Sequence, residues 1–297
     1  MYNQNLLSRF EIYLAAERRV SSNTVIAYKT DLMQFAHFLS RITSQKTLTA
    51  ATMHDVRDWI MSLVKEALNT CSINRKIAAL RTFYTFLQKK ELMVDRPTDG
   101  LKSLKVKKRL PIFFQEKELL SFLNQYVFPV NFSGFRDKLI LEMVYGTGIR
   151  LNELLSLHIT DINLINRTIK VLGKRNKERL IPFLQPLKQM IETYLSQKEA
   201  LGYSSIKELF ITDRGKPCYP MLIYRIIKKH LATNIQAGRH SPHIFRHTFA
   251  THLLNNGASL LSIKYLLGHS SLMATQHYTH VDVTRLKKAF QDAHPRA

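Results

Sequence analysis

Apolar residues recur at helical spacing through most of the first ninety residues of this 297-residue chain. Four such stripes lie within residues 6–14, 25–39, 56–64 and 73–87, where leucine, isoleucine, valine and aromatic residues stand three or four positions apart. Ser21 or Ser22 can cap the second stripe, and Thr52 followed by Asp55 resembles a capping pair before the third. Because an amphipathic helix must bury its apolar face, the pattern predicts a four-helix N-terminal domain.

This pattern ends at residues 95–100, where the sequence DRPTDG contains the helix breakers proline and glycine. Five of the eight residues from Lys102 to Arg109 are basic. A chain of this length is comfortable for two domains. We therefore predict an N-terminal domain of residues 1–94, a basic linker of residues 95–112 and a C-terminal domain of residues 113–297.

The second half combines helical patterns with a small sheet. Residues 168–172, 179–183 and 209–212 have the composition of short strands, and a polar, glycine-led turn over residues 173–178 joins the first two as a hairpin. Helical patterns occupy residues 116–124, 135–145, 187–201, 221–235, 243–256, 259–267 and 283–292. The whole chain is therefore predicted to be mainly α-helical, with a small β-sheet in its second domain.

The charge of the chain points to a polyanionic partner. Lysine and arginine number 44 against 22 aspartates and glutamates, which gives a net charge of +22. Both halves are basic, with +10 over residues 1–110 and +12 over the rest. Nucleic acid is the leading candidate, ahead of an anionic membrane surface. In that case we interpret the linker as a basic segment that crosses a phosphate backbone, rather than as a merely solvated connection. Its DNA-contacting residues would be Lys102, Lys105, Lys107, Lys108 and Arg109.

Cysteine content and apolar runs bear on the compartment. Cys71 and Cys218 stand far apart and in no metal-binding pattern, so neither a zinc site nor a disulfide scaffold is expected. The charged N-terminal residues do not form the apolar core of a signal peptide. No apolar run approaches the roughly 18 residues typical of a transmembrane helix. We expect a cytoplasmic protein that does not associate with membranes.

Four separated segments carry the residues that suggest chemistry. They are GTGIRLNE (146–153), Gly173-Lys174, HIFRH (243–247), and Leu267-Gly-His269 followed by HYTH (277–280). His243 and Arg246 are three positions apart, His269 follows Arg246 by 23, and Tyr278 follows His269 by nine. In order and spacing these segments resemble the tyrosine recombinase (phage integrase) family. The resemblance covers nearly the whole chain, and it is greatest to the short, Xer-type members.

The resemblance implies a fold and a reaction. The fold would be a two-domain, C-shaped clamp around DNA, with an N-terminal core-binding, SAM-like domain and a C-terminal catalytic domain. The reaction would cut and rejoin DNA through a 3′-phosphotyrosyl intermediate with Tyr278 as nucleophile, without metal, ATP or other cofactor. Arg150 and Arg246 would bind the phosphate, His243 would exchange the proton of Tyr278, and His269 would donate to a nonbridging oxygen. Lys174 would protonate the departing 5′ oxygen.

Elementary chemistry agrees with these roles. An ordinary tyrosine has a pKa of about 10, so cationic neighbours are needed to favour the phenolate. Planar guanidinium groups bind phosphate oxygens bidentately and stay charged. Glu153, three residues after Arg150, would orient that arginine, and His247 would pack against or support the site. Arg175 and Lys177 share the turn of Lys174 and would contact DNA, unless they are simply solvated.

A metal site is the rival interpretation of His243 and His247, which stand at positions i and i+4. Residue 244 is isoleucine, so the acid of an HExxH motif is missing, and no nearby carboxylate cluster offers a third ligand. We expect no metal.

Three functions remain open at this stage. A site-specific recombinase is favoured over a type IB topoisomerase, which shares the chemistry, and over a catalytically silent DNA-binding protein. A recombinase of this kind would act as a homo- or hetero-tetramer on DNA. It could resolve chromosome dimers during chromosome partition and cell division, with a second Xer-type recombinase and a division-linked DNA translocase. Alternatively, it could integrate or excise a mobile element.

Overall fold

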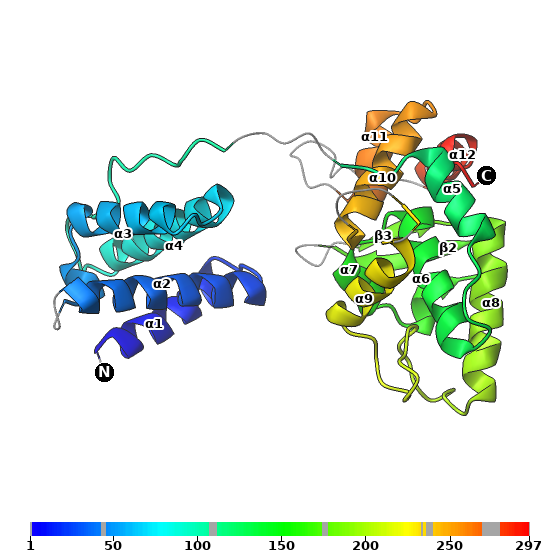
Figure 1. Ribbon diagram of the computed structural model, residues 1–297, viewed down its shortest axis with the longest axis horizontal. Helices are drawn as coiled ribbons and strands as arrows, with labels where there is room; N and C mark the ends of the chain where they lie inside the picture. The colour runs from blue at the N-terminus through cyan, green and yellow to red at the C-terminus, as the bar shows by residue number, and fades with distance from the viewer. Residues whose placement is uncertain are drawn as a thin grey trace. The chain divides into compact units, whose positions relative to one another are not determined.

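The structure is a computed structural model that describes residues 2–42, 46–106, 112–173, 178–232, 234–235, 240–268 and 280–296. For residues 2–4 and 280–285 it describes the backbone alone. The chain divides into two compact units, Met1–Arg109 and Leu110–Ala297. Most described residues are helical, and the strands among them form one three-stranded antiparallel sheet in the second unit (Figure 1). The predicted mainly α fold with a small sheet is confirmed.

The N-terminal unit contains the four predicted helices. They are α1 (Tyr2–Ile12), which continues into a π-helical turn (Tyr13–Glu17), α2 (Ser22–Ile42), α3 (Met53–Lys65) and α4 (Thr70–Lys89). Phe10 of α1 packs edge-on against Phe83 of α4 at 5.2 Å between ring centroids, in the middle of the buried core. The predicted cap of α3 is confirmed, because Thr52 Oγ1 accepts from Asp55 N and an Asp55 oxygen accepts from Thr52 N.

A buried ion cluster joins α2 to α4. Asp31 of α2 is completely buried and accepts hydrogen bonds from Arg75 Nη1 at 2.5 Å and Lys76 Nζ at 2.9 Å. Lys76 is itself buried, whereas Arg75 is partly exposed. Every ionised group of this cluster therefore faces an opposite charge.

The first residues of the basic segment bond to the N-terminal unit. The Asn74 side chain of α4 pairs with both backbone groups of Leu104, and Arg81 donates to the carbonyl of Leu101. Leu101 and Leu104 pack against the core of this unit. The domain boundaries expected at residues 94 and 112 stay predictions.

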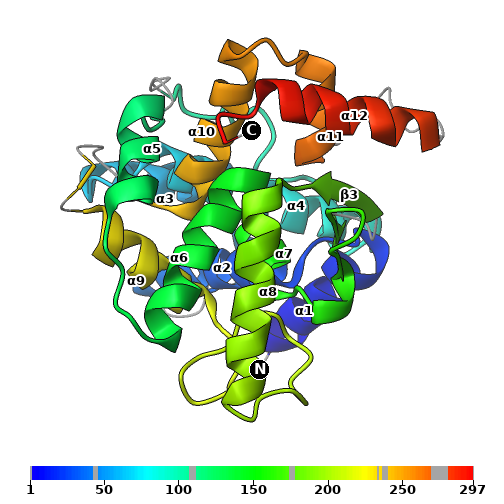
Figure 2. The same ribbon diagram turned by 90° about the vertical axis from the view of Figure 1, so that its right-hand side faces the viewer.

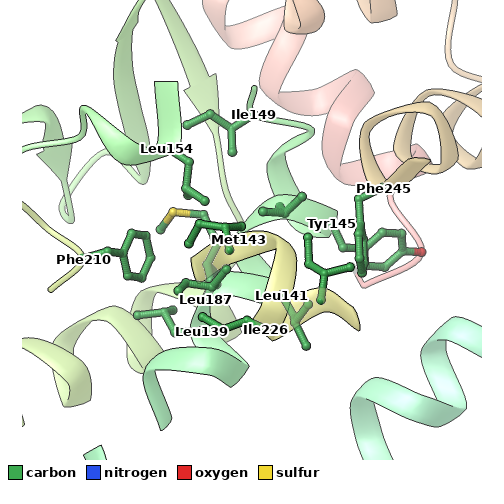
Figure 3. Packing of buried hydrophobic residues seen from close by; sticks show 14 of the residues in the cluster. Leu139, Leu141, Met143, Tyr145, Ile149, Leu154, Leu187, Phe210, Ile226 and Phe245 are labelled. Carbon is green, nitrogen blue, oxygen red and sulfur yellow. The ribbon is translucent and has the colours of Figure 1, made fainter. Parts of the chain in front are cut away.

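The second unit is built around the buried helix α6 (Phe132–Thr147). Its other helices are α5 (Glu116–Gln125), α7 (Leu151–Leu155), α8 (Gln185–Ala200), α9 (Pro220–Leu231), α10 (Pro242–Asn255), α11 (Leu260–Leu267) and α12 (His280–Ala293). Seven helical patterns of this half are thus confirmed. α8 lies beside α6, as Figure 2 shows, and α6 side chains such as Leu141 and Met143 fill the core (Figure 3).

The sheet pairs β1 (Ile162–Asn163), β2 (Thr168–Leu172) and β3 (Glu178–Pro182) in that order. Ile169 lies opposite Ile181, and both are completely buried, so the two predicted strands of the hairpin are confirmed. The strand expected over residues 209–212 is wrong. Ile211 forms an isolated bridge with Pro217, beside backbone bonds from Thr212 to Lys216 and from Cys218 to Phe210. Pro217 has no N–H to donate, so the pairing does not extend into a ladder.

The C-terminal helix α12 packs on its own chain. Leu286 and Phe290 are buried in a cluster with Phe249 of α10 and Leu266 of α11, and Figure 2 shows the three helices together. Beyond α12, Arg296 forms an ion pair with Glu142 of α6.

Candidate active site

The site begins at a sharp turn between α6 and α7. α6 ends at Gly148, which has the left-handed conformation with a φ of 59°. A Cβ atom here would stand 2.4 Å from the Phe249 ring of α10, so both the backbone angle and the close packing require glycine. Two residues later, Arg150 is the N-cap of α7. The turn thus holds Arg150 at the junction of two helices.

Glu153 fixes Arg150 twice. One carboxylate oxygen of Glu153 accepts from the backbone N–H of Arg150 at 2.9 Å, and the other accepts from Arg150 Nη1 at 2.8 Å. The Glu153 side chain is buried, whereas the Arg150 side chain keeps 29% of its surface exposed. The guanidinium is therefore held from behind while part of it faces solvent.

A second arginine, Arg179 of β3, binds the same carboxylate. Its two terminal nitrogens donate to the two oxygens of Glu153 at 2.7 and 2.8 Å, and its Nε donates to the carbonyl of Leu266 at 3.0 Å. Arg179 is 8% exposed. Arg179 lies outside the four sequence segments that suggest chemistry, and its role was not predicted. Its position in β3 could have marked it, because Arg179 stands at an inward-facing position and the other inward-facing residues of this strand are apolar.

Arg246 comes from α10, whose first residue is Pro242. It is 9% exposed and donates to the carbonyl of Gly148 at 2.7 Å and to the carbonyl of Leu267. Both acceptors are neutral. The bonds use two of the five N–H donors of the guanidinium, so they leave others for a further acceptor.

The three arginines meet at the end of α11. Three successive carbonyls, of Leu266, Leu267 and Gly268, accept from Arg179, Arg246 and Arg150 respectively. Gly268 ends the helix in the left-handed conformation, with a φ of 61°. A helix C-terminus is negatively polarised, so it is a favourable anchor for cations.

The cluster carries more positive than negative charge, with three arginines and one glutamate. Burial opposes the charge of Glu153, but hydrogen bonds from Arg179 and Arg150 outweigh it and hold the pKa of Glu153 at about 2. Burial, followed by repulsion from Arg150 and Arg179, lowers the pKa of Arg246 to about 9. Two guanidinium groups thus bind one carboxylate and a third bonds to carbonyls beside them, which makes the cluster suited to bind an anion.

The two histidines of α10 have different surroundings. His243 is exposed, one turn before Arg246 on the same helix. His247 is partly buried, and its ring contacts Phe113 edge-on at 6.3 Å. The structure thus brings Arg150, Glu153 and Arg246 into one hydrogen-bonded cluster, with His243 exposed beside it on α10.

The remaining predicted site residues lie mostly outside the described residues. These are the catalytic candidates Lys174, His269 and Tyr278, and the DNA-contact candidates Lys107, Lys108, Arg109, Arg175 and Lys177. Lys102 and Lys105 are described and exposed. All assigned roles at these positions stay predictions.

The described residues contain neither a candidate metal site nor a candidate membrane span. No group of three or more His, Cys, Asp or Glu residues there could hold a metal ion. Among the helices in the described part of the chain, none is long and apolar enough to cross a membrane.

Comparison with known proteins gives matches to both units. The Phage integrase family matches residues 113–285, and the Phage integrase N-terminal SAM-like domain matches residues 7–91. Tyrosine recombinase XerC of Chlorobaculum tepidum is 34% identical over 99% of this chain and 96% of its own length. Tyrosine recombinase XerC of Staphylococcus epidermidis is 38% identical over 97% and 96%.

Solved structures match the fold. XerH recombinase bound to palindromic difH substrate has a TM-score of 0.71 at 22% identity, over 95% of this chain and 83% of the other. The Tn1549 transposon integrase in complex with circular intermediate DNA has a TM-score of 0.69 at 20% identity, over 95% and 97%. At these identities the likeness concerns the fold alone.

Proposed function

Since this chain belongs to the phage integrase family and is a tyrosine recombinase, we propose that it cuts and rejoins duplex DNA with the arginine cluster as its phosphate-binding site. One observation carries the proposal: Arg150 and Arg246 are anchored on adjacent carbonyls at the end of α11. Transfer of a DNA phosphoryl group develops negative charge on two nonbridging oxygens. Guanidinium groups held in advance stabilise that charge without reorganising during the reaction.

The unbalanced charge of the cluster supports this role. Glu153 neutralises only part of the positive charge of Arg150 and Arg179, and Arg246 donates to carbonyls alone among its described contacts. A phosphodiester would supply the missing negative charge. Arg150 is the partly exposed member of the cluster, so it is the one that faces an incoming strand.

Tyr278 is the proposed nucleophile. Its phenolic oxygen attacks the scissile phosphorus, the bond from phosphorus to the 5′ oxygen breaks, and a 3′-phosphotyrosyl ester forms. His243 accepts the phenolic proton, Lys174 gives a proton to the departing 5′ oxygen, and His269 donates to a nonbridging oxygen. Religation is the reverse, with the 5′ hydroxyl of the partner strand attacking the ester. The energy of the broken bond is kept in the ester, so no ATP is required.

Double-stranded DNA is the proposed partner of both units. The two solved recombinase structures described above both contain DNA. The exposed Lys102 and Lys105 lie on a basic segment, which we propose contacts phosphates together with Lys107, Lys108 and Arg109. Strand exchange between two sites needs four active sites, so the proposed assembly is a tetramer of this chain, alone or with a second Xer-type recombinase.

The proposed biological role is resolution of chromosome dimers at a fixed site in the cytoplasm. Relatives named XerC, matched over nearly their full length, support this role over integration of a mobile element. A division-linked DNA translocase would be the further partner.

A nicked suicide duplex tests the chemistry directly. Cleavage next to the nick releases a short fragment and traps the covalent protein–DNA adduct on a denaturing gel. With EDTA present, wild-type protein is expected to form the adduct on a duplex carrying the chromosomal resolution site, and Tyr278→Phe to form none. An adduct that persists in Tyr278→Phe would show that another residue is the nucleophile.

The same experiment separates the alternatives. A type IB topoisomerase would form the adduct on a scrambled duplex equally well, and would relax plasmids without the site. A mobile-element integrase would prefer the ends of its element over the chromosomal site. A silent DNA-binding protein would shift the duplex on a native gel and leave it uncut.

A further inference from the structure

We propose that Arg179 is a positioning residue that fixes the β2–β3 hairpin against the phosphate-binding arginines. The inference rests on the proposed function and adds to it a residue outside the sequence motifs. Its starting point is geometric, because all three nitrogens of the Arg179 guanidinium donate to groups of the site and none to a neighbouring strand.

The bidentate pair with Glu153 sets the orientation of two elements at once. Arg179 pairs with Val171 in the β2–β3 ladder, so its backbone belongs to the hairpin. Glu153 belongs to α7, and its carboxylate also holds the backbone and side chain of Arg150. A bidentate arginine–carboxylate pair fixes both distance and angle. The hairpin and Arg150 are therefore anchored on the same carboxylate, and Glu153 keeps its own two bonds to Arg150 when Arg179 is replaced.

A third element closes around the same side chain. Arg179 Nε donates to Leu266 at the end of α11, and a Cβ atom at Gly268 would stand 3.0 Å from Arg179 Cδ. The glycine thus lets the α11 terminus lie directly on the arginine side chain. Arg179 connects the hairpin, Arg150 and the turn that leads into His269.

The consequence concerns the proposed general acid. Lys174 follows β2 in sequence, and Arg179 is the second residue of β3, so Lys174 stands in the connection between the two strands that Arg179 anchors. If Arg179 sets where the hairpin stands, its loss displaces Lys174 relative to the phosphate held by Arg150 and Arg246. Misplacement of a catalytic group by about 1 Å can cost on the order of 100-fold in rate. DNA affinity, which depends on many phosphate contacts, is expected to change little.

The test compares Arg179→Met and Arg179→Lys with wild type on two suicide duplexes. One duplex has the normal 5′ oxygen, and the other has a bridging 5′ sulfur at the scissile phosphate. Cleavage of the second breaks the P–S bond and expels a thiolate, which needs no proton from Lys174. Single-turnover adduct formation is measured at saturating protein, and affinity is measured separately by titration.

We expect Arg179→Met to cleave the oxygen duplex about 10- to 100-fold more slowly than wild type, and the sulfur duplex within about threefold of wild type. Arg179→Lys keeps a charge but loses the bidentate geometry. Its cleavage rate on the oxygen duplex is expected to lie between those of wild type and Arg179→Met. An equal loss on both duplexes would overturn the proposal, because it would assign Arg179 to the site in general and not to the hairpin.

Arg136→Met is the matched control, because Arg136 is also buried and paired with a carboxylate, that of Asp137. It is expected to lower stability while the two duplexes respond alike. Circular dichroism identifies any variant that fails to fold, and Arg179→Lys then serves alone. Failure of the proposed function appears differently, as absence of an adduct with wild-type protein on either duplex.

Discussion

Each unit of this recombinase buries one carboxylate between two cations, and the two clusters differ in what lies next to them. Asp31 joins α2 to α4 through Arg75 and Lys76. Glu153 joins α7 to β3 through Arg150 and Arg179. Among the described residues, no further charged side chain pairs with Asp31, Arg75 or Lys76. In the catalytic unit a third guanidinium, that of Arg246, bonds to backbone carbonyls beside the pair.

The difference teaches how to distinguish an ion cluster that holds helices together from one that awaits a ligand. Paired charges stabilise the folded state only modestly, but removing one partner is costly. A buried cation without a carboxylate partner disfavours its own charge, and burial together with Arg150 and Arg179 lowers the pKa of Arg246 to about 9. Such a cost is tolerated where an anion is going to bind.

The first and largest prediction removes each carboxylate in turn. Asp31→Asn leaves the buried Lys76 without its carboxylate, and Glu153→Gln leaves the buried Arg179 without its own, so each should lower the free energy of unfolding of its own unit by about 3–5 kcal/mol. Trp59 is the single tryptophan and is buried in the N-terminal core, so its fluorescence reports that unit alone. Asp31→Asn should shift the urea midpoint measured by tryptophan fluorescence. Glu153→Gln should leave that midpoint unchanged and shift the urea midpoint measured by circular dichroism.

The two variants should differ further in activity. With DNA bound in advance at saturating protein, Glu153→Gln should slow single-turnover cleavage on the order of 100-fold, because Arg150 loses its orientation. Asp31→Asn should leave this step within about twofold, since none of the proposed catalytic residues belongs to the N-terminal unit. Equal loss of cleavage in both variants would contradict the comparison.

The second prediction concerns acid. The folded-state pKa of Glu153 is about 2, below its ordinary value, so the unfolded state binds the proton more readily. The stability gained is fully present above pH 4.5 and is lost as the pH falls toward 2. The shift corresponds to about 3 kcal/mol. The urea midpoint measured by circular dichroism should therefore fall more steeply between pH 5 and pH 3 in wild type than in Glu153→Gln. Equal slopes in the two proteins would contradict this role of Glu153.

Much of this architecture was predictable because local patterns and tertiary packing agree. The helical stripes, the Thr52 cap and the two strands of the hairpin follow from apolar spacing and turn composition, and the structure confirms them. The 209–212 strand was wrong because its pairing depends on a turn back to Pro217, which apolar composition does not encode.

The clustering of the arginines was beyond sequence reasoning. Arg179 and Glu153 are 26 residues apart, and Leu266 is 87 residues from Arg179. The acceptors at the end of α11 are backbone carbonyls, which every residue possesses, so no side-chain motif marks them. A sequence pattern can identify which residues are unusual, but the partner of a buried charge is set by tertiary packing.

The third prediction changes the turn that carries Arg150. Gly148→Ala places a Cβ atom against Phe249 at a positive φ, and should lower the free energy of unfolding by about 2 kcal/mol. Because the Gly148 carbonyl accepts from Arg246, cleavage should also slow. Gly146→Ala is the control. Its Cβ would meet only Leu187 at 3.8 Å, within a helix, so it should be neutral or slightly stabilising by circular dichroism.

The fourth and smallest prediction returns to the N-terminal unit. Thr52→Ala removes one half of the capping box of α3, and should lower the free energy of unfolding by about 1 kcal/mol. The Thr52 backbone and side chain also donate to Asp55, whose pKa these bonds and Lys46 lower against the effect of burial. The loss should therefore shrink as the pH falls and Asp55 becomes protonated.

Trp59 lies one turn beyond Asp55 on the same helix, so tryptophan fluorescence in urea measures the Thr52→Ala effect directly. Cleavage of bound DNA should match wild type, because the cap stabilises a helix and holds no phosphate-binding group. Slower cleavage at saturating protein would mean that destabilising the N-terminal unit also disturbs the arginine cluster. It would contradict the distinction between a cluster that holds helices together and one that binds an anion.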